Sequence, residues 1–306
     1  MLVLVTGITG NIGQHLIESL TSRGHQVRGL SRDSSKLSHE QVEKLESFVK
    51  IENYYDIPAI ERGVNGVDAV ICAYTGIPIT TVDAQLILLR AAERANVKRF
   101  IASSWAYDWR ATTLGAHDGY DAHLAFESTA TLTSTIKPNW IFSGALAEVL
   151  FSFPGRVNFT PQHNGAWDLA KNSIDIWGTG NEKLYWTSER DAAEFAAAIV
   201  GREGAEEGGY WTVTSGVHSL REMALIYEQV RGTKITLNER GTVGELRSAA
   251  FEAKKKGNRK VFWEYIGFFY YLYMIDGTWK MGELQNKELG VRGTTLEEYL
   301  KEHPEI

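Results

Sequence analysis

Side chains that can move protons gather in one segment of the chain, residues 104–127. Histidine, tyrosine and glutamate are common general acids and bases, and a serine hydroxyl can hydrogen-bond a substrate oxygen. Tyr120, Leu124 and Glu127 are spaced so that they share one face of a helix beginning at Tyr120, with His123 at its edge. We predict acid–base chemistry on a small molecule. The candidate catalytic residues are Ser104, His117, Tyr120, His123 and Glu127.

Each candidate also has an ordinary structural interpretation. The histidines could be solvated or hydrogen-bonded at the surface, Tyr120 could pack in the core, and Glu127 could be a solvated helix residue. Ser104 lies at the end of a predicted strand, at the edge where open α/β sheets bind ligands. The sequence has neither the HExxH nor the paired CxxC spacing of a metal site, and no GxSxG nucleophile motif. We therefore predict no metal site.

A second chemical feature is the glycine-rich turn in MLVLVTGITGNIG at the start of the chain. Gly7, Gly10 and Gly13 recur at three-residue spacing between an apolar run and a helical pattern. Such a turn lets backbone N–H groups and the positive end of a helix dipole hold a dinucleotide pyrophosphate. The spacing is GxxGxxG rather than the GxGxxG of the usual fingerprint. We predict a nucleotide site at residues 7–13.

The residues after the second predicted strand, LSRDSSKL, indicate which dinucleotide binds. NAD sites usually place an acidic residue there, where it accepts hydrogen bonds from the ribose. Ser31 and Arg32 occupy this place and Lys36 follows, which favours the 2′-phosphate of NADP(H). Asp33 is the competing acid, but it lies past the strand and is expected to be a turn or cap residue. The alternative is that Arg32 and Lys36 are merely solvated.

The elements that position these residues are predicted by alternating strand and helix patterns. The alternation indicates right-handed crossovers and a doubly wound parallel Rossmann sheet of the α/β class. It loosens from about residue 106. We predict an NADP-binding domain at 1–150 that also includes parts of 174–215, and a smaller α+β lobe, mainly 151–306, that covers the substrate. The expected strands include 2–6, 26–32, 47–52, 68–74, 99–105 and 136–144, and the expected helices include 11–23, 39–47, 58–63, 82–95 and 121–135.

Composition excludes several classes of function. The net charge of -6 provides no basic surface for nucleic acid, so no such partner is expected. The longest apolar-aromatic stretch, 261–275, contains Glu264 and is shorter than the ~20 residues that span a bilayer. It predicts a buried or pocket-lining helix and no membrane partner. The single cysteine, Cys72, fits a buried strand position and a reducing compartment, so we expect a cytoplasmic protein.

Several segments together resemble one known family. They are TGITGNIG, LSRDSSKL, YYDIPAIERGVNGVDAVI, KRFIASSWAYDW, WGTGNEKLYWTSERDAAEFAAAIV and YMIDGTWKMGELQN. In these segments the chain is similar to the NmrA-like and isoflavone-reductase-like branch of atypical short-chain dehydrogenases, especially its fungal members. The resemblance implies an NADP(H) cofactor in the cleft at the glycine turn. It also implies an aromatic or polyketide-like substrate beneath the C-terminal lobe.

The resemblance assigns cofactor-binding residues by position. The 2′-phosphate falls at Arg32 and Lys36, beside Ser31, and the adenine falls near Tyr55 and Asp56. The remaining residues are Gly7, Thr9, Gly10, Asn11, Ile12 and Gly13 at the pyrophosphate, with Ala73 and Tyr74 along the rest of the cofactor.

The chain departs from this family at the catalytic helix. Reductases of the branch carry a lysine that would fall near Phe126 or Glu127, and sister families carry Tyr-xxx-Lys, where Leu124 stands at the lysine position. No lysine occurs between residues 100 and 136. Lys137 lies beyond the predicted helix and is expected to point elsewhere. Because such a lysine lowers a neighbour's pKa and donates hydrogen bonds, its absence leaves the use of the cofactor open.

Three hypotheses follow. The leading one is an NADPH-dependent reductase of an aromatic or polyketide-type small molecule in specialised metabolism, with Tyr120 or a nearby histidine supplying the proton. The second keeps the fold without the redox step, as an isomerase, cyclase or dehydratase in which His117, His123 or Glu127 moves protons. The third is a catalytically silent regulatory protein that senses NADP(H). A monomer or a homodimer is expected.

Overall fold

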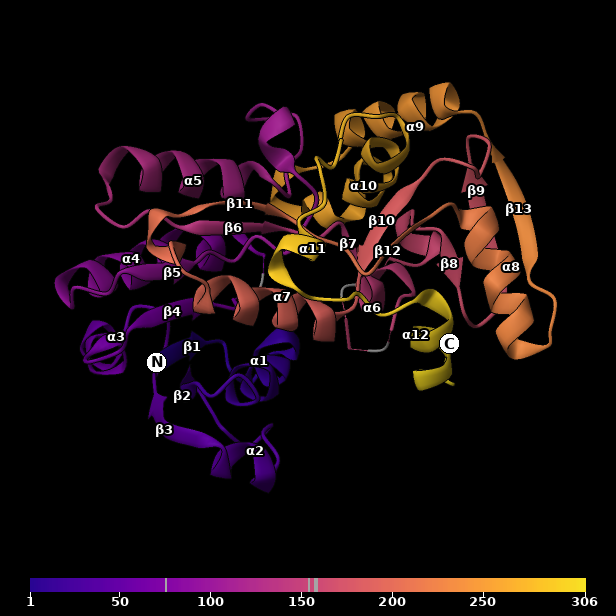
Figure 1. The fold of residues 1–306 in the computed structure, drawn as a ribbon. Helices are drawn as coiled ribbons and strands as arrows, with labels where there is room; N and C mark the ends of the chain where they lie inside the picture. The colour runs from indigo at the N-terminus through magenta and orange to yellow at the C-terminus, as the bar shows by residue number, and fades with distance from the viewer. Residues whose placement is uncertain (75, 154, 157–158) are drawn as a thin grey trace.

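The computed structural model describes residues 1–74, 76–153, 155–156 and 159–306 and shows a parallel sheet joined to a second lobe (Figure 1). Within these residues the sheet has seven strands in the order β11-β6-β5-β4-β1-β2-β3, and its paired neighbours run parallel. The predicted doubly wound Rossmann sheet is confirmed. The strands are β1 (Leu2–Thr6), β2 (Gln26–Ser31), β3 (Leu45–Lys50), β4 (Ala69–Cys72), β5 (Arg99–Ile101), β6 (Asn139–Phe142) and β11 (Gly209–Thr212).

Helices cover both faces of this sheet. Side chains alternate between the two faces along each strand, and apolar ones point to both. On β1, Val3 and Val5 pack with α1 and α7, whereas Leu4 packs on the opposite face with α3, α4 and α5. Burial of one such side chain stabilises the fold by about 1.5–3 kcal/mol. The helices of this part are α1 (Asn11–Thr21), α2 (His39–Glu43), α3 (Ile57–Val64), α4 (Gln85–Arg94), α5 (Asp121–Thr133) and α7 (Glu189–Gly201), with a π-helical turn, Ile79–Ala84, before α4.

The second lobe mixes strands and helices. In one small sheet β10 pairs parallel to β7 and antiparallel to β12, and in another β9 pairs parallel to β13 and antiparallel to β8. The strands are β7 (Ala145–Leu146), β8 (Trp167–Asp168), β9 (Ser173–Trp177), β10 (Leu184–Thr187), β12 (Gly216–His218) and β13 (Thr236–Gly241). The helices are α6 (Ala147–Leu150), α8 (Leu220–Arg231), α9 (Val243–Lys256), α10 (Ile266–Ile275), α11 (Asn286–Leu289) and α12 (Leu296–Glu302).

The prediction of one continuous helix over residues 261–275 is wrong. A 3-10 helix, Arg259–Glu264, and α10 are separated at Tyr265, whose φ of −127° is not helical. The Tyr265 hydroxyl donates to the buried Asp118 carboxylate at 2.9 Å. This long-range contact, rather than local helix propensity, determines the conformation of Tyr265. Among the described residues, no helix has the length and apolar character needed to cross a bilayer.

Candidate functional site

The glycine turn between β1 and α1 has no room for side chains at two of its positions. Gly7 takes a φ of +70°, and a Cβ atom there would lie 2.5 Å from the Ala73 carbonyl oxygen. A Cβ atom on Gly13 would lie 2.2 Å from the Gly7 carbonyl oxygen. Both distances are shorter than any non-bonded contact allows. The close approach of β1, α1 and the end of β4 therefore requires glycine.

The first turn of α1 is open to an anion. Its N-cap, Gly10, has no side chain to cap the helix, and Gly10 and Asn11 are exposed while Ile12 is buried. The Thr9 hydroxyl lies 2.8 Å from the Ser31 hydroxyl, which ties the turn to the end of β2. An uncapped first turn offers N–H donors and the positive end of the helix dipole. The turn therefore fits the pyrophosphate of a dinucleotide.

The end of β2 presents two cations beside this turn. Arg32 and Lys36 are exposed, and the Arg32 guanidinium lies 5.5 Å from the centre of the Tyr54 ring. The Asp33 carboxylate accepts a hydrogen bond from the Ser35 N–H at 3.0 Å, so Asp33 is the predicted turn residue. Its carboxylate is engaged within its own turn, while both cations face solvent. This arrangement favours an anionic group on the ribose.

The residues assigned to the adenine differ in how free they are. Tyr55 is 54% exposed and can offer its ring to a flat ligand. The Asp56 carboxylate caps α3, since one oxygen accepts from the Ala59 N–H at 3.3 Å and the other accepts from the Glu52 N–H at 3.0 Å. Asp56 thus has a structural role that does not depend on a ligand.

The end of β4 connects the glycine turn to the catalytic candidates. Ala73 is half-buried against Gly7, and Tyr74 is buried next to it. A Cβ atom on Gly76 would lie 3.8 Å from the Nε2 atom of His123. The two predicted groups of residues therefore meet at the carboxyl edge of the sheet, where open α/β sheets bind their ligands.

Aromatic rings from both lobes pack around Trp279 at this edge. The Trp279 indole stacks on Tyr120 with ring centres 4.8 Å apart and on Tyr107 at 5.3 Å, and it is only 3% exposed. His117 lies 5.1 Å from Trp279. Such stacked and edge-on pairs stabilise the packing beyond the area they bury. The group, called here the aromatic cluster, comprises Tyr107, His117, Tyr120, Tyr270, Tyr273 and Trp279.

His117 is the most unusual member of the aromatic cluster. Its side chain is almost fully buried, and neither ring nitrogen has a hydrogen-bond partner in another described residue. Burial, aided by the nearby Lys254 ammonium and opposed by Asp118, lowers the pKa of His117 to about 3. The imidazole is therefore neutral at physiological pH. It can donate from one nitrogen and accept at the other.

Tyr120 and His123 flank His117 at the start of α5. Burial raises the pKa of Tyr120 well above its usual value, and the Tyr120 and Tyr270 hydroxyls are hydrogen-bonded to each other. His123 stacks on Trp109 with centres 5.8 Å apart, and burial lowers its pKa to about 4. Both residues thus keep their uncharged forms, with the tyrosine protonated and the histidine neutral.

An ion-pair network fixes the loop that carries His117 to the second lobe. The Asp118 carboxylate lies 3.0 Å from the Lys254 ammonium and 2.6 Å from the Arg259 guanidinium. Lys254 also donates to the Gly115 carbonyl at 2.7 Å. Burial alone would raise the pKa of Asp118, but its cationic and hydroxyl partners hold it below the usual range. We call Asp118, Lys254, Arg259 and Tyr265 the lobe clamp.

Besides His123, whose ring centre lies 5.6 Å from that of Tyr120, two predicted catalytic residues lie outside the aromatic cluster. Ser104 is fully buried, accepts from the Ile141 N–H at 2.7 Å and donates back to the same residue's carbonyl. These bonds join the segment after β5 to β6. The Ser104 hydroxyl therefore has a structural role here, at the place where a catalytic role was predicted. The Glu127 carboxylate accepts a hydrogen bond from the Tyr210 hydroxyl at 2.6 Å. Glu127 therefore faces β11 rather than His117.

Sequence reasoning missed the residues that the second lobe supplies. Tyr270 and Tyr273 come from α10, Trp279 follows it, and Lys254 comes from α9. The sequence signal for the first two was only that the stretch 261–275 could line a pocket. Lys137 was predicted to point elsewhere, and its ammonium does pair with Glu207 at the surface.

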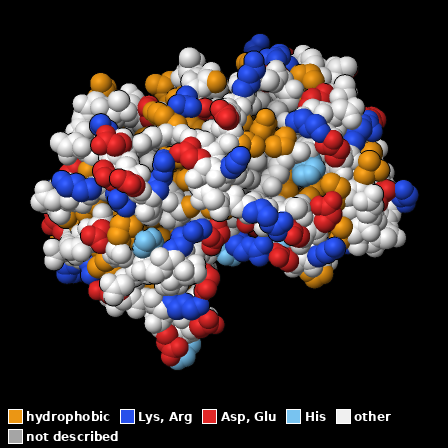
Figure 2. Space-filling view, in the orientation of Figure 1, with side chains coloured by type: hydrophobic (Ala, Val, Ile, Leu, Met, Phe, Trp, Pro, Cys, Tyr) orange, Lys and Arg blue, Asp and Glu red, His pale blue; other side chains and the backbone are white. Residues whose placement is uncertain are grey.

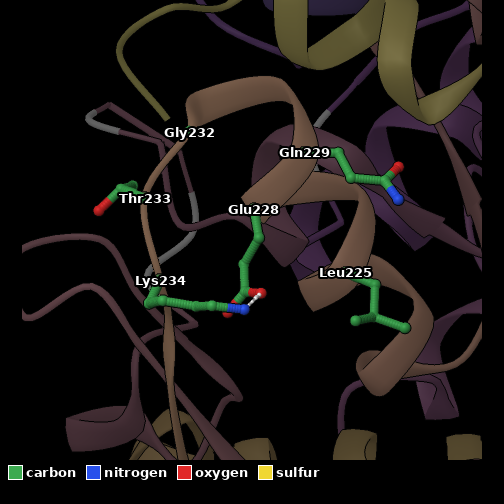
Figure 3. A pocket seen from close by; sticks show the side chains of 6 residues that line it. All are labelled: Leu225, Glu228, Gln229, Gly232, Thr233 and Lys234. Atoms are coloured by element: carbon green, nitrogen blue, oxygen red, sulfur yellow. Dashed lines mark hydrogen bonds and ion pairs between the residues drawn. The ribbon is translucent and has the colours of Figure 1, made fainter.

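A groove on the second lobe lies away from these residues, at the end of α8. It has a volume of about 390 Å³ and is lined by Leu225, Glu228, Gln229, Gly232, Thr233 and Lys234. Figure 3 shows Lys234 and Glu228 reaching toward each other across it, and their charged atoms are 2.6 Å apart. Because Lys234 and Glu228 already pair with each other, the groove adds no free charged group to the candidate site.

A parallel sheet with a glycine turn after its first strand defines a Rossmann-type protein. The NmrA-like family model matches residues 1–300, so the chain belongs to the NmrA-like family. This confirms the family predicted from the sequence motifs.

Relatives and solved structures agree with this placement. The chain is 26% identical to pinoresinol reductase 2 of Arabidopsis thaliana, over 98% of this chain and 96% of that protein. A structure of AtPrR2 with NADP+ and (+)pinoresinol has a TM-score of 0.73 at 22% identity, covering 98% of this chain and 97% of that one. A ternary complex of leucoanthocyanidin reductase from Vitis vinifera has a TM-score of 0.76 at 19% identity, covering 99% of each chain.

Proposed function

We propose that the protein is an NADP(H)-dependent reductase of an aromatic small molecule in specialised metabolism. The observation that carries the proposal is the position of His117 and Tyr120. Both are buried and uncharged among stacked rings, at the sheet edge that the glycine turn also reaches. A curated relative that aligns along nearly the whole chain is a pinoresinol reductase, and a neighbouring structure holds NADP+ with (+)pinoresinol. These names support a phenolic, multi-ring substrate.

The cofactor would be held by residues that already fit it. Gly7 and Gly13 allow the close backbone packing that forms the turn, where a Cβ atom would clash, and the open start of α1 suits the pyrophosphate. Arg32 and Lys36 would hold the 2′-phosphate. When bound, NADPH supplies a hydride.

The aromatic cluster would supply the other half of the reduction. As an electrophilic carbon of the substrate gains the hydride, its oxygen gains an electron pair and must take up a proton. Tyr120 keeps its hydroxyl proton at neutral pH and can donate it to that oxygen, and its hydrogen bond with the Tyr270 hydroxyl holds it in place. Neutral His117 can donate a hydrogen bond from one ring nitrogen to the same oxygen. No lysine of the helix is needed for these roles.

The decisive experiment is NADPH oxidation by the purified protein with a panel of quinones, ketones, enones and lignan-type phenols. We expect turnover with at least one aromatic acceptor and its loss, by about 100-fold, in Tyr120→Phe. Tight NADPH binding with no oxidation by any compound would contradict the reductase and favour the regulatory alternative. Turnover of a substrate without added nicotinamide cofactor would favour the isomerase, cyclase or dehydratase alternative.

A further inference from the structure

A buried group of charges lies beside the glycine turn and has no part in the reaction proposed above. It lies where α1 and α7 begin. These two helices run side by side in the same direction, so their first residues are close together. At their starts the Asn11 side chain is hydrogen-bonded to the Glu189 carboxylate, and farther along Arg23, just after α1, pairs with Glu194 of α7 at 2.7 Å. In Figure 2 this face of the molecule is hollowed between α1 and α12, and Lys and Arg side chains gather along the hollow.

The Glu189 carboxylate is held by Arg156 in a two-point ion pair. The Arg156 Nε atom lies 2.9 Å from Oε1, and its Nη2 atom lies 2.8 Å from Oε2. The Glu189 side chain is 3% exposed and the Arg156 side chain 25%. A pair of this geometry is strong, and loss of its cation would leave a carboxylate without compensation in a buried place.

A second buried carboxylate shares this place. Glu148 accepts the Glu189 N–H at 3.2 and 3.1 Å with its two oxygens. Burial and the charge of Glu189 raise the pKa of Glu148 to about 7. Two carboxylates thus lie close together here, and Arg156 pairs with Glu189, the one that Asn11 faces.

The neighbouring charged groups are occupied elsewhere. The Arg190 guanidinium pairs with Glu302 at 2.9 Å, and the Asp191 carboxylate accepts from the Thr294 N–H at 2.7 Å. Burial, with Arg190 and Arg156, lowers the pKa of His15, so this histidine adds no cation at neutral pH. The ring of His303 packs on Tyr299, and its Nδ1 lies 3.1 Å from Glu305. Arg156 is therefore the described cation that directly pairs with Glu189.

We propose that Arg156 sustains NADP(H) binding by neutralising Glu189 beside the glycine turn. Asn11 belongs to the turn's predicted pyrophosphate site and faces the same carboxylate. Without Arg156 the unpaired charge of Glu189 would repel the pyrophosphate, because Asn11 links this carboxylate directly to the turn. Arg156 is thus a positioning residue that acts through Glu189. The inference rests on the proposed NADP(H) function of the turn.

The test is a set of NADPH titrations followed by the cofactor's fluorescence at pH 8. Arg156→Met should weaken NADPH binding about tenfold, because it leaves the negative charge of Glu189 without its partner. Glu189→Gln leaves the Arg156 charge unopposed and should bind NADPH at least as tightly as the wild type does. The double variant Arg156→Met with Glu189→Gln should recover to within about threefold of wild type, since the repelling charge is gone.

Two controls separate this effect from damage to the fold. Adenosine 2′-monophosphate carries the adenine and the 2′-phosphate but no pyrophosphate, and its affinity should be unchanged in Arg156→Met. Arg156→Lys keeps the positive charge and should bind NADPH nearly normally, even if the methionine variant fails to fold.

Three results would count against the role of Arg156 or against the proposed NADP(H) function, and they show which of the two fails. Normal NADPH affinity in Arg156→Met would overturn the role of Arg156 alone. A double variant as weak as Arg156→Met would also overturn it, by showing that Arg156 contacts the cofactor directly. A wild-type protein that does not bind NADPH at all would overturn the proposed function first.

Discussion

The glycine turn and the aromatic cluster meet at one edge of the sheet but are built in opposite ways. The turn comes from contiguous residues, is open to solvent and presents backbone donors near exposed cations. The cluster combines Tyr107, His117 and Tyr120 with Tyr270, Tyr273 and Trp279, is closed, and keeps His117 and Tyr120 uncharged. In the proposed function this difference would divide the work: the turn would hold the anionic cofactor and the cluster would contact the aromatic substrate.

The strongest test of this division alters the turn by one carbon. Gly7→Ala places a Cβ atom 2.5 Å from the Ala73 carbonyl oxygen, so NADPH binding should be abolished. Gly24→Ala is the matched control, because Gly24 also has a positive φ, +77°, with open space around it. The control should lose about 1 kcal/mol of stability and keep its NADPH affinity. Titration and chemical unfolding of both variants measure the contrast, and equal affinities would remove the special role of the turn.

A change in the aromatic cluster should affect turnover and leave cofactor binding alone. His117→Phe keeps a ring of similar size between Tyr120 and Trp279 but removes both nitrogens. We expect kcat to fall by about 100-fold, as when a general acid or hydrogen-bond donor is removed, with the Kd for NADPH unchanged. Full activity in this variant would limit the chemistry to Tyr120 and its hydroxyl partner.

The same variant should change how stability depends on pH. The pKa of His117 is lowered to about 3 in the fold. The unfolded chain therefore takes up this proton first, and stability present above pH 6.5 is lost as the pH falls toward 3. At pH 5 the loss is about 2 kcal/mol, which His117→Phe should avoid. Urea unfolding at pH 7.5 and pH 5 measures it, with the exposed His39→Phe as control; equal pH dependence in wild type and His117→Phe would refute it.

The smallest expected effect concerns the choice between cofactors. Arg32→Ala removes an exposed guanidinium near the end of β2. It should weaken NADPH binding about tenfold, the contribution of one charge-assisted hydrogen bond, and leave NADH binding unchanged. Arg62→Ala, which removes an exposed cation from α3, should change neither affinity. A parallel loss for NADH in Arg32→Ala would place Arg32 away from the 2′-phosphate.

These two regions also differ in how far sequence predicts them. The turn was predictable because Gly7 and Gly13 meet constraints set by neighbours in the chain, and the cations after β2 follow at a familiar distance. The aromatic cluster was predicted only in part: His117 and Tyr120 lie close together in sequence, but the rings that enclose them come from α10 and Trp279. Ser104 illustrates the limit, because a strand-end hydroxyl looks the same in sequence whether it faces a ligand or the next strand.

The position of Trp279 has a kinetic consequence. Its indole fills the space between Tyr107, His117 and Tyr120, so an aromatic substrate would stack on these rings only if the indole moved away. Association would then follow conformational selection, with an observed binding rate that levels off at high substrate concentration and reports the opening step. The apparent dissociation constant would equal the intrinsic one divided by the open fraction. Shortening this one side chain, as in Trp279→Leu, should therefore increase the association rate of the substrate, even if the bound substrate then dissociates faster.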